Sequence, residues 1–230
     1  PDRATHRAGV QRAPALFFKI HAMTRSVLAE IDRYRPDTPL DEACTPPASW
    51  YVDPRILELE LDTTFAATWQ YACRLDQVRE PGQFVTFELA GEPLLVVCGS
   101  DGVVRGFFNV CRHHAAAVVE QSHGCLKRLR CPYHGWTYTL EGALKAAPAF
   151  EGVRNFDPAD HSLVPVATTV WENWVFVRLA GEGSSLEESL GSEVVAQVRG
   201  LGLANLHWFE RKHYVFDCNW KVFVDNYLDG

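Results

Sequence analysis

Two short stretches, Cys111-Arg-His113 and Cys131-Pro-Tyr-His134, decide how this sequence folds and what it can bind. Each places one thiol and one imidazole within a few residues, and residues 114–130 separate the two stretches. Sequence typical of strands flanks both, so two loop tips can converge on one site. Thiolates and neutral imidazoles are both metal ligands. We therefore expect a metal site whose four ligands are Cys111, His113, Cys131 and His134.

The mixed composition of each stretch distinguishes between kinds of metal site. In one type of [2Fe–2S] cluster, two cysteines bind one iron and two histidines bind the other. Two imidazoles in place of two thiolates leave the oxidised cluster formally neutral, which raises its reduction potential. A structural Cys2His2 zinc site usually pairs cysteine with cysteine and histidine with histidine. The pattern here favours the iron–sulfur cluster, with a zinc site as the alternative.

Two further histidines lie close to these ligands in the sequence. His114 directly follows a predicted ligand, and we expect its side chain to point away from the site. His123 lies in Gln-Ser-His-Gly, where we expect a solvated turn residue. Neither is predicted to bind the metal.

The rest of the sequence predicts a mainly β fold, with a small barrel or sandwich around the metal site. Asp53-Pro54 is typical of a helix start, and Phe65, Trp69 and Cys73 would share one face of that helix. From Gly82 onward, short apolar runs alternate with turn residues, which indicates strands. The expected strands are Phe84–Leu89, Pro93–Cys98, Val103–Val110 and Val170–Val177, with a hairpin over Trp136–Leu144.

We expect three parts along the chain. Residues 1–50 form a leader and an extended arm, and residues 51–180 form the metal-binding domain with its preceding helix. Residues 181–230 form a linker, with a polar loop or short helix at Glu182–Ser192, and the start of another domain. Asn219–Gly230 predicts an amphipathic helix with Trp220, Phe223 and Tyr227 on one side.

Composition narrows the partners and the compartment. The chain has 230 residues and a formal net charge of −7, which argues against nucleic acid as a partner. No apolar run reaches the roughly 18 residues that a membrane span needs. Seven cysteines, an odd number without a secretory signal, indicate a reducing compartment. We expect Cys73, Cys98 and Cys218 to be buried, inert thiols.

Residues 1–22 are rich in arginine and poor in acidic residues. Such a segment is typical of a transit peptide, which would place the protein in the plastid stroma. The alternative is that Met23 begins the protein, which would then be cytoplasmic. We expect a soluble protein in either case.

The motif CRH…CPYHGW resembles the Rieske domain of ring-hydroxylating and related oxygenases. Respiratory Rieske proteins carry an extra cysteine in each loop, and the two form a disulfide. Here Ala116 and Tyr133 stand near those places, so the resemblance is to the oxygenase and ferredoxin class. By the same resemblance, Trp136 packs against the cluster-binding loops and shields the cluster.

A second motif, NWK…DNY at residues 219–227, is similar to the opening of the catalytic domain in Rieske oxygenase α-subunits. The resemblance implies a mononuclear non-haem Fe(II) held by two histidines and a carboxylate. Those ligands lie beyond this chain, so we expect it not to turn over substrate by itself. An acidic residue links the two metal sites in the family. Asp229 is the nearest match here and Asp225 the second.

Residues 36–230 resemble the choline monooxygenases, which use reduced ferredoxin and O₂ to convert choline to betaine aldehyde. The resemblance rests on Pro36–Leu40, Thr45–Tyr51, C-x-H-H-A and NWKVFVDNYLDG. Many aromatic-ring dioxygenases have Arg-Gly where this chain has His114-Ala115. The resemblance implies a homotrimer that takes electrons from a ferredoxin or reductase and hydroxylates choline or a related small quaternary ammonium compound. Aromatic-ring hydroxylation and a stand-alone electron carrier are the alternatives.

Overall fold

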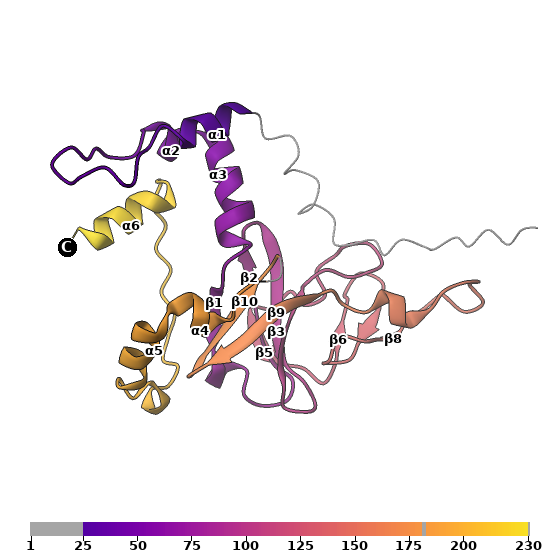
Figure 1. Ribbon diagram of the computed structural model, residues 1–230. Coiled ribbons are helices and arrows are strands. Elements are labelled where there is room, and N and C mark those ends of the chain that lie inside the picture. Colours follow the sequence, from indigo (N-terminus) through magenta and orange to yellow (C-terminus); the bar gives the residue numbers. More distant parts are fainter. Residues whose placement is uncertain (1–24, 181–182, 230) are drawn as a thin grey trace, which may run out of the picture. The chain divides into compact units, whose positions relative to one another are not determined.

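The computed structural model describes residues 25–180 and 183–229, which form two units (Figure 1). One unit contains the described residues from Ala66 to Trp208, and the other contains those up to Phe65 and from Phe209 onward. The predicted leader at residues 1–22 lies outside the described residues. The predicted boundaries after residues 50 and 180 stay predictions.

The first unit is built from two antiparallel sheets. The larger sheet has the strand order β1-β10-β9-β4-β3-β2-β5, and the smaller sheet has the order β6-β7-β8. The strands are β1 (Gln70–Arg74), β2 (Gln83–Leu89), β3 (Glu92–Cys98), β4 (Val104–Phe108), β5 (His123–Cys125), β6 (Leu129–Arg130), β7 (Thr137–Tyr138), β8 (Leu144–Ala146), β9 (Pro165–Trp171) and β10 (Trp174–Arg178). The predicted mainly β fold is confirmed.

Strand β3 separates two apolar cores because its side chains alternate between the two faces of the sheet. Leu94 and Val96 join one core, together with residues of β10, while Leu95 and Val97 join the other. This second core also contains Cys111, Cys131 and Trp136. The alternation along β3 therefore gives the predicted metal site a dry, packed floor.

Short turns set the register of these strands. β2 and β3 are joined at Ala90 and Gly91, whose φ angles of +53° and +80° are those of a type I′ hairpin turn. The predicted strand at Val170–Val177 is wrong, because β9 and β10 form a hairpin in which Trp171 pairs with Trp174. Glu172 adopts φ +54° in that turn. The apolar residues on both sides of this turn made the segment resemble one continuous strand in the sequence.

The predicted helical face of Phe65, Trp69 and Cys73 is also wrong. The helix α3 (Pro54–Glu60) continues into one wider turn, Leu61–Phe65, and ends there. Cys73 lies instead in β1 and pairs with Val175 of β10, where it is buried in the core of the sheet. Pairing with the sheet overrides the local helical pattern at these positions.

The second unit contains α1 (Arg25–Ile31), α2 (Ser49–Val52), α3 and α6 (Trp220–Leu228). The helix start at Asp53-Pro54 is confirmed, since the Asp53 carboxylate accepts a hydrogen bond from the backbone N–H of Arg55. The helix predicted over Asn219–Gly230 is confirmed over Trp220–Leu228, which is α6, and Asn219 caps its start. The predicted extended arm is wrong over α1, because the prolines that prevent a helix begin only at Pro36.

Further helices follow β10 in the first unit. These are α4 (Leu186–Leu190), which Ser185 caps, and α5 (Ser192–Arg199). In the part of the chain that the structure describes, no helix combines the length and apolar character that crossing a membrane demands. Cys73 and Cys98 are buried as predicted, whereas Cys218 is exposed, so the prediction of a buried thiol there is wrong.

Candidate metal centre

The two motif-bearing loops have the same backbone geometry. In the first, the N–H of Cys111 donates to the carbonyl of Ala116 (2.8 Å), and the N–H of Ala115 donates to the carbonyl of Cys111 (3.0 Å). In the second, the N–H of Cys131 donates to the carbonyl five residues on (2.9 Å), and Gly135 donates to Cys131 (3.1 Å). Ala115 and Gly135 both have positive φ, +57° and +74°. The sequence therefore folds into two matching loops.

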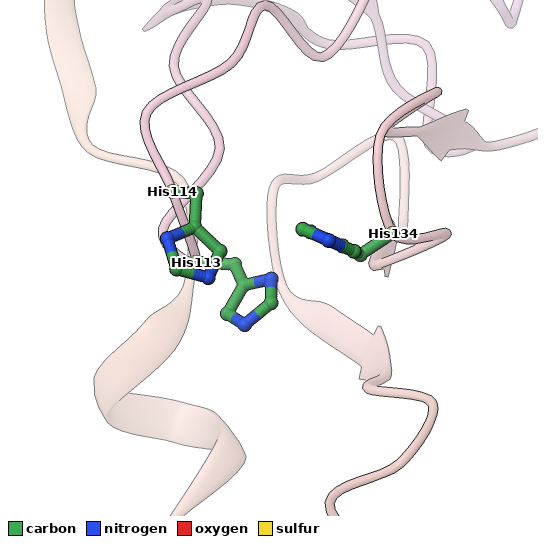
Figure 2. A group of neighbouring side chains, drawn as sticks. All are labelled: His113, His114 and His134. Carbon is green, nitrogen blue, oxygen red and sulfur yellow. The ribbon is translucent and has the colours of Figure 1, made fainter.

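The four predicted ligands are divided by depth. Cys111 and Cys131 are only 3% and 2% exposed, and their thiols contact each other. His113 is half-buried and His134 is exposed. Figure 2 shows His113 and His134 projecting from opposite loops, and their ring centroids lie 4.8 Å apart. The loops thus bring a buried thiol pair next to an outward-facing imidazole pair.

The imidazole of His113 is held by aromatic rings. It stacks on Trp136, with ring centroids 4.9 Å apart and planes within 6° of parallel, and it meets the edge of Phe150 at 5.5 Å. Its buried Nδ1 has no hydrogen-bond partner among the described residues. Burial, together with His114 and His134, lowers the pKa of His113. The lowered pKa favours the neutral ring, and its buried nitrogen is available for a metal.

The hydroxyl of Tyr138 forms a hydrogen bond with the sulfur of Cys111. Its hydroxyl lies 3.4 Å from Sγ and accepts a hydrogen bond from the backbone N–H of Arg112 at 3.0 Å. Burial raises the pKa of Tyr138 and keeps the phenol protonated. Burial also raises the pKa of the Cys111 thiol, although the Tyr138 hydroxyl acts in the opposite direction. Because the hydroxyl accepts from Arg112, its own proton is available to the sulfur.

We predict that Tyr138→Phe lowers the reduction potential of the bound cluster. A hydrogen bond to a ligand sulfur stabilises the reduced, more negative state, so its removal disfavours reduction. The backbone N–H of Arg112 also loses its acceptor, which costs about 1–3 kcal/mol of folding free energy. Redox titration followed by visible spectroscopy checks the first effect. An unchanged or higher potential would contradict the proposed role of the hydroxyl.

Asn109 fixes the segment that follows the first loop. Its buried Oδ1 accepts hydrogen bonds from the N–H groups of Val118 (3.1 Å) and Val119 (3.0 Å), and its Nδ2 donates to the carbonyl of Val119 (2.7 Å). Asn109 comes directly after β4, so it secures both ends of the loop that carries Cys111 and His113. The sequence predictions missed it. The available signal was a polar residue between apolar strand residues and the motif.

We predict that Asn109→Ala lowers the free energy of unfolding by about 2–3 kcal/mol, because it leaves buried backbone groups without partners. Thermal or denaturant unfolding measures this loss. Asn173→Ala is a useful comparison, since among the described residues the Asn173 side chain makes one hydrogen bond, to the carbonyl of Leu203 in the same unit. Equal losses in the two variants would contradict the special position of Asn109.

His114 does not point away from the site, so that prediction is wrong. Its ring centroid lies 4.0 Å from that of His113 and 5.2 Å from that of His134. The nearest ligand nitrogens of the three histidines all lie within 4.8 Å of one another (Figure 2). Ala115 has a left-handed backbone conformation, which closes the loop tightly and keeps the side chains of His113 and His114 together. His123 is exposed in β5, opposite Val85, and its expected place in a turn is corrected to a short edge strand.

The residues present fit a [2Fe–2S] cluster. Two buried thiols suit the inner iron, and two imidazoles nearer the surface suit the outer iron. The two predicted acidic residues belong to the other unit. Asp225 accepts a hydrogen bond from the hydroxyl of Tyr51 at 2.7 Å, and Asp229 caps the C-terminal end of α6.

Comparisons with known proteins agree with this geometry. Residues 68–157 match the family model of the Rieske [2Fe-2S] domain. The chain is 37% identical over 210 residues to the chloroplastic choline monooxygenase of Arabidopsis thaliana, covering 87% of this chain and 50% of that protein. It is 34% identical over 194 residues to the carnitine monooxygenase oxygenase subunit of Escherichia coli (strain K12), covering 82% and 50%.

A solved structure extends the likeness to the fold. A quaternary ammonium Rieske monooxygenase, described in terms of carnitine oxidation and inter-subunit electron transfer, superposes with a TM-score of 0.75 at 28% identity. The match covers 79% of this chain and 50% of that one. The chain thus spans about half the length of the relatives it matches. It carries a Rieske [2Fe–2S] domain and is related over most of its length to the choline and carnitine monooxygenases of the Rieske oxygenase family.

Proposed function

We propose that this chain is the electron-accepting part of a Rieske oxygenase α-subunit and that Cys111, His113, Cys131 and His134 hold its cluster. The observation that carries the proposal is the division of these ligands by depth. The thiols of Cys111 and Cys131 lie in the core, while the imidazoles face outward. The cluster, when bound, supplies one-electron transfer at this position.

The residues around the site have separate tasks in this proposal. The exposed ring of His134 offers an entry point for an electron from a ferredoxin or reductase. Trp136 and Phe150 exclude water from the buried face of His113 and fix the plane of its ring. Tyr138 donates a hydrogen bond toward the Cys111 sulfur. These contacts keep one side of the site dry and leave the other open to a partner protein.

We also propose that the whole protein holds a mononuclear Fe(II), whose ligands are not in this chain, and acts as a homotrimer. Asp229, or Asp225 as the second choice, would then link the Rieske domain of one subunit to the iron of its neighbour. The inter-subunit electron transfer described for a related quaternary ammonium monooxygenase supports this arrangement. The chloroplastic choline monooxygenases among the relatives support a plastid location if residues 1–22 are a transit peptide. A start at Met23 would favour the cytoplasm.

Choline is the substrate we propose, with related quaternary ammonium compounds next. Choline, O₂, two electrons and two protons would give the hydrate of betaine aldehyde and one water. The support comes from the named relatives, which act on choline and carnitine, and from His114-Ala115 in place of the Arg-Gly of many aromatic-ring dioxygenases.

The test is product analysis of the whole protein with choline, O₂ and a reduced ferredoxin system. Formation of betaine aldehyde in proportion to the ferredoxin oxidised supports the proposal. Oxidation of an aromatic hydrocarbon, with choline untouched, would favour ring hydroxylation instead. Reversible reduction of the cluster with no O₂-dependent product from any substrate class would favour a stand-alone electron carrier.

A further inference from the structure

The chain segments before and after the Rieske domain are joined to each other by a partly buried ion pair. Glu60, the last residue of α3, binds the Nζ of Lys221 through both carboxylate oxygens, at 2.7 and 2.8 Å. The two side chains are only 14% and 12% exposed. The same carboxylate accepts a hydrogen bond from the indole N–H of Trp220 at 2.9 Å. One side chain of α3 therefore holds the first two residues of α6.

Apolar packing and a second hydrogen bond complete this joint. The ring of Trp220 meets the ring of Phe65 edge to face, with centroids 5.2 Å apart. A little more than one turn further along α6, the carboxylate of Asp225 accepts a hydrogen bond from the hydroxyl of Tyr51 at 2.7 Å. The helix is thus fixed at its first turn and again near its middle by residues of α2 and α3. Rotation of α6 about its axis would break both contacts.

The two acidic residues of α6 differ in their surroundings. The carboxylate of Asp225 accepts a hydrogen bond from the hydroxyl of Tyr51 in the same chain. Asp229 lies exposed at the C-terminal end of the helix. Asp225 already uses one oxygen to hold the helix.

We propose that Glu60 and Tyr51 are positioning residues for α6, with Asp225 as their anchor and Asp229 as the carboxylate that serves the second metal site. This inference rests on the proposed function for the role of Asp229. It also assigns Glu60 and Tyr51 a part in electron transfer although neither residue lies in the Rieske domain match. The contacts of α6 with Glu60 and Tyr51, and not the local sequence of α6, would set the direction in which Asp229 points.

The first experiment compares conservative changes in the whole protein, loaded with cluster and iron. The cluster is reduced, mixed with choline and O₂, and its reoxidation is followed by visible absorption in a single turnover. Asp229→Asn should slow reoxidation at least a hundredfold. Asp225→Asn should slow it no more than about threefold, because the amide oxygen still accepts from Tyr51. Equal losses, or a larger loss at Asp225, would overturn the assignment.

The second experiment tests the anchor without using electron transfer. Hydrogen exchange of the backbone N–H groups of α6 is measured in Glu60→Gln, Lys221→Met and the double variant. Each single change leaves one partly buried charge unpaired and should speed exchange at least tenfold. The double variant removes both charges and should exchange more slowly than either single variant. Glu58→Gln, an exposed carboxylate on the same helix, is the matched control and should match the wild type.

Hydrogen exchange and cluster reoxidation distinguish a failure of the positioning role from a failure of the proposed function. Unchanged exchange in Glu60→Gln would overturn the positioning role, whatever the protein oxidises. A wild-type cluster that is never reoxidised with any quaternary ammonium compound and O₂ would refute the proposed function. Slower reoxidation in Glu60→Gln and Tyr51→Phe, with unchanged cluster absorption and reduction potential, supports positioning over a general loss of structure.

Discussion

Replacing Cys111 with serine is expected to abolish the visible absorption of the cluster and the EPR signal of its reduced state. The Cys111 thiolate is the proposed iron ligand, and a buried serine hydroxyl is a far weaker donor to iron. Cys111 is 3% exposed and packed against Cys131 and Tyr138, so no solvent ligand can take its place without opening the core. His134→Ala should have the same spectroscopic outcome, because the outer iron loses one of its two imidazoles.

Cys125→Ser is the matched control for this prediction. Cys125 lies in β5 of the same unit, but it is exposed and belongs to neither loop. Its replacement should leave the absorption, the EPR signal and the content of acid-labile sulfide unchanged. A normal spectrum in Cys111→Ser would contradict the ligand assignment. Colourless wild-type protein with bound zinc and no acid-labile sulfide would favour the zinc alternative.

The sequence was sufficient to predict the four candidate ligands and most strands of the Rieske domain, because both depend on local patterns. A thiol and an imidazole on each of two loops have few chemical uses. Apolar alternation between turn residues also marks β2 and β3 closely. The hairpin of β9 and β10 was missed because the two tryptophans beside its two-residue turn made the segment seem continuous.

Contacts between distant residues could not be predicted in the same way. Tyr138 approaches Cys111 only after β7 pairs with its neighbours, and Asn109 binds Val118 and Val119 only once the first loop has closed. The joint between Glu60 and Lys221 connects residues on either side of a whole domain. Periodicity within one helix carries no information about such pairs. For the same reason, the sequence ranked Asp229 above Asp225 by family resemblance alone and gave no sign that Asp225 contacts Tyr51.

Trp136→Ala is the second change for which we expect a large effect, here on both stability and the cluster. Trp136 is 1% exposed and packs against His113, Phe150 and Phe156, with ring centroids 4.9, 5.0 and 5.8 Å away. Truncation to alanine leaves a cavity beneath the His113 ring and should lower the free energy of unfolding by about 3–5 kcal/mol. The indole N–H has no partner among the described residues, so the loss is one of packing.

Trp136→Ala should also shorten the lifetime of the cluster in air. Without the stacked ring, His113 loses its fixed plane and water reaches its buried face, so the cluster should be bleached faster in air. Trp171→Ala is the control, because Trp171 is also buried but belongs to a separate apolar cluster with Leu186 and Val195. It should lower stability by about 3 kcal/mol while the folded protein keeps its normal visible spectrum. Trp136→Phe keeps an aromatic ring against His113 and should recover much of the cluster lifetime. Equal bleaching rates in the two alanine variants, at matched stability, would show that Trp136 acts only through the general stability of the domain.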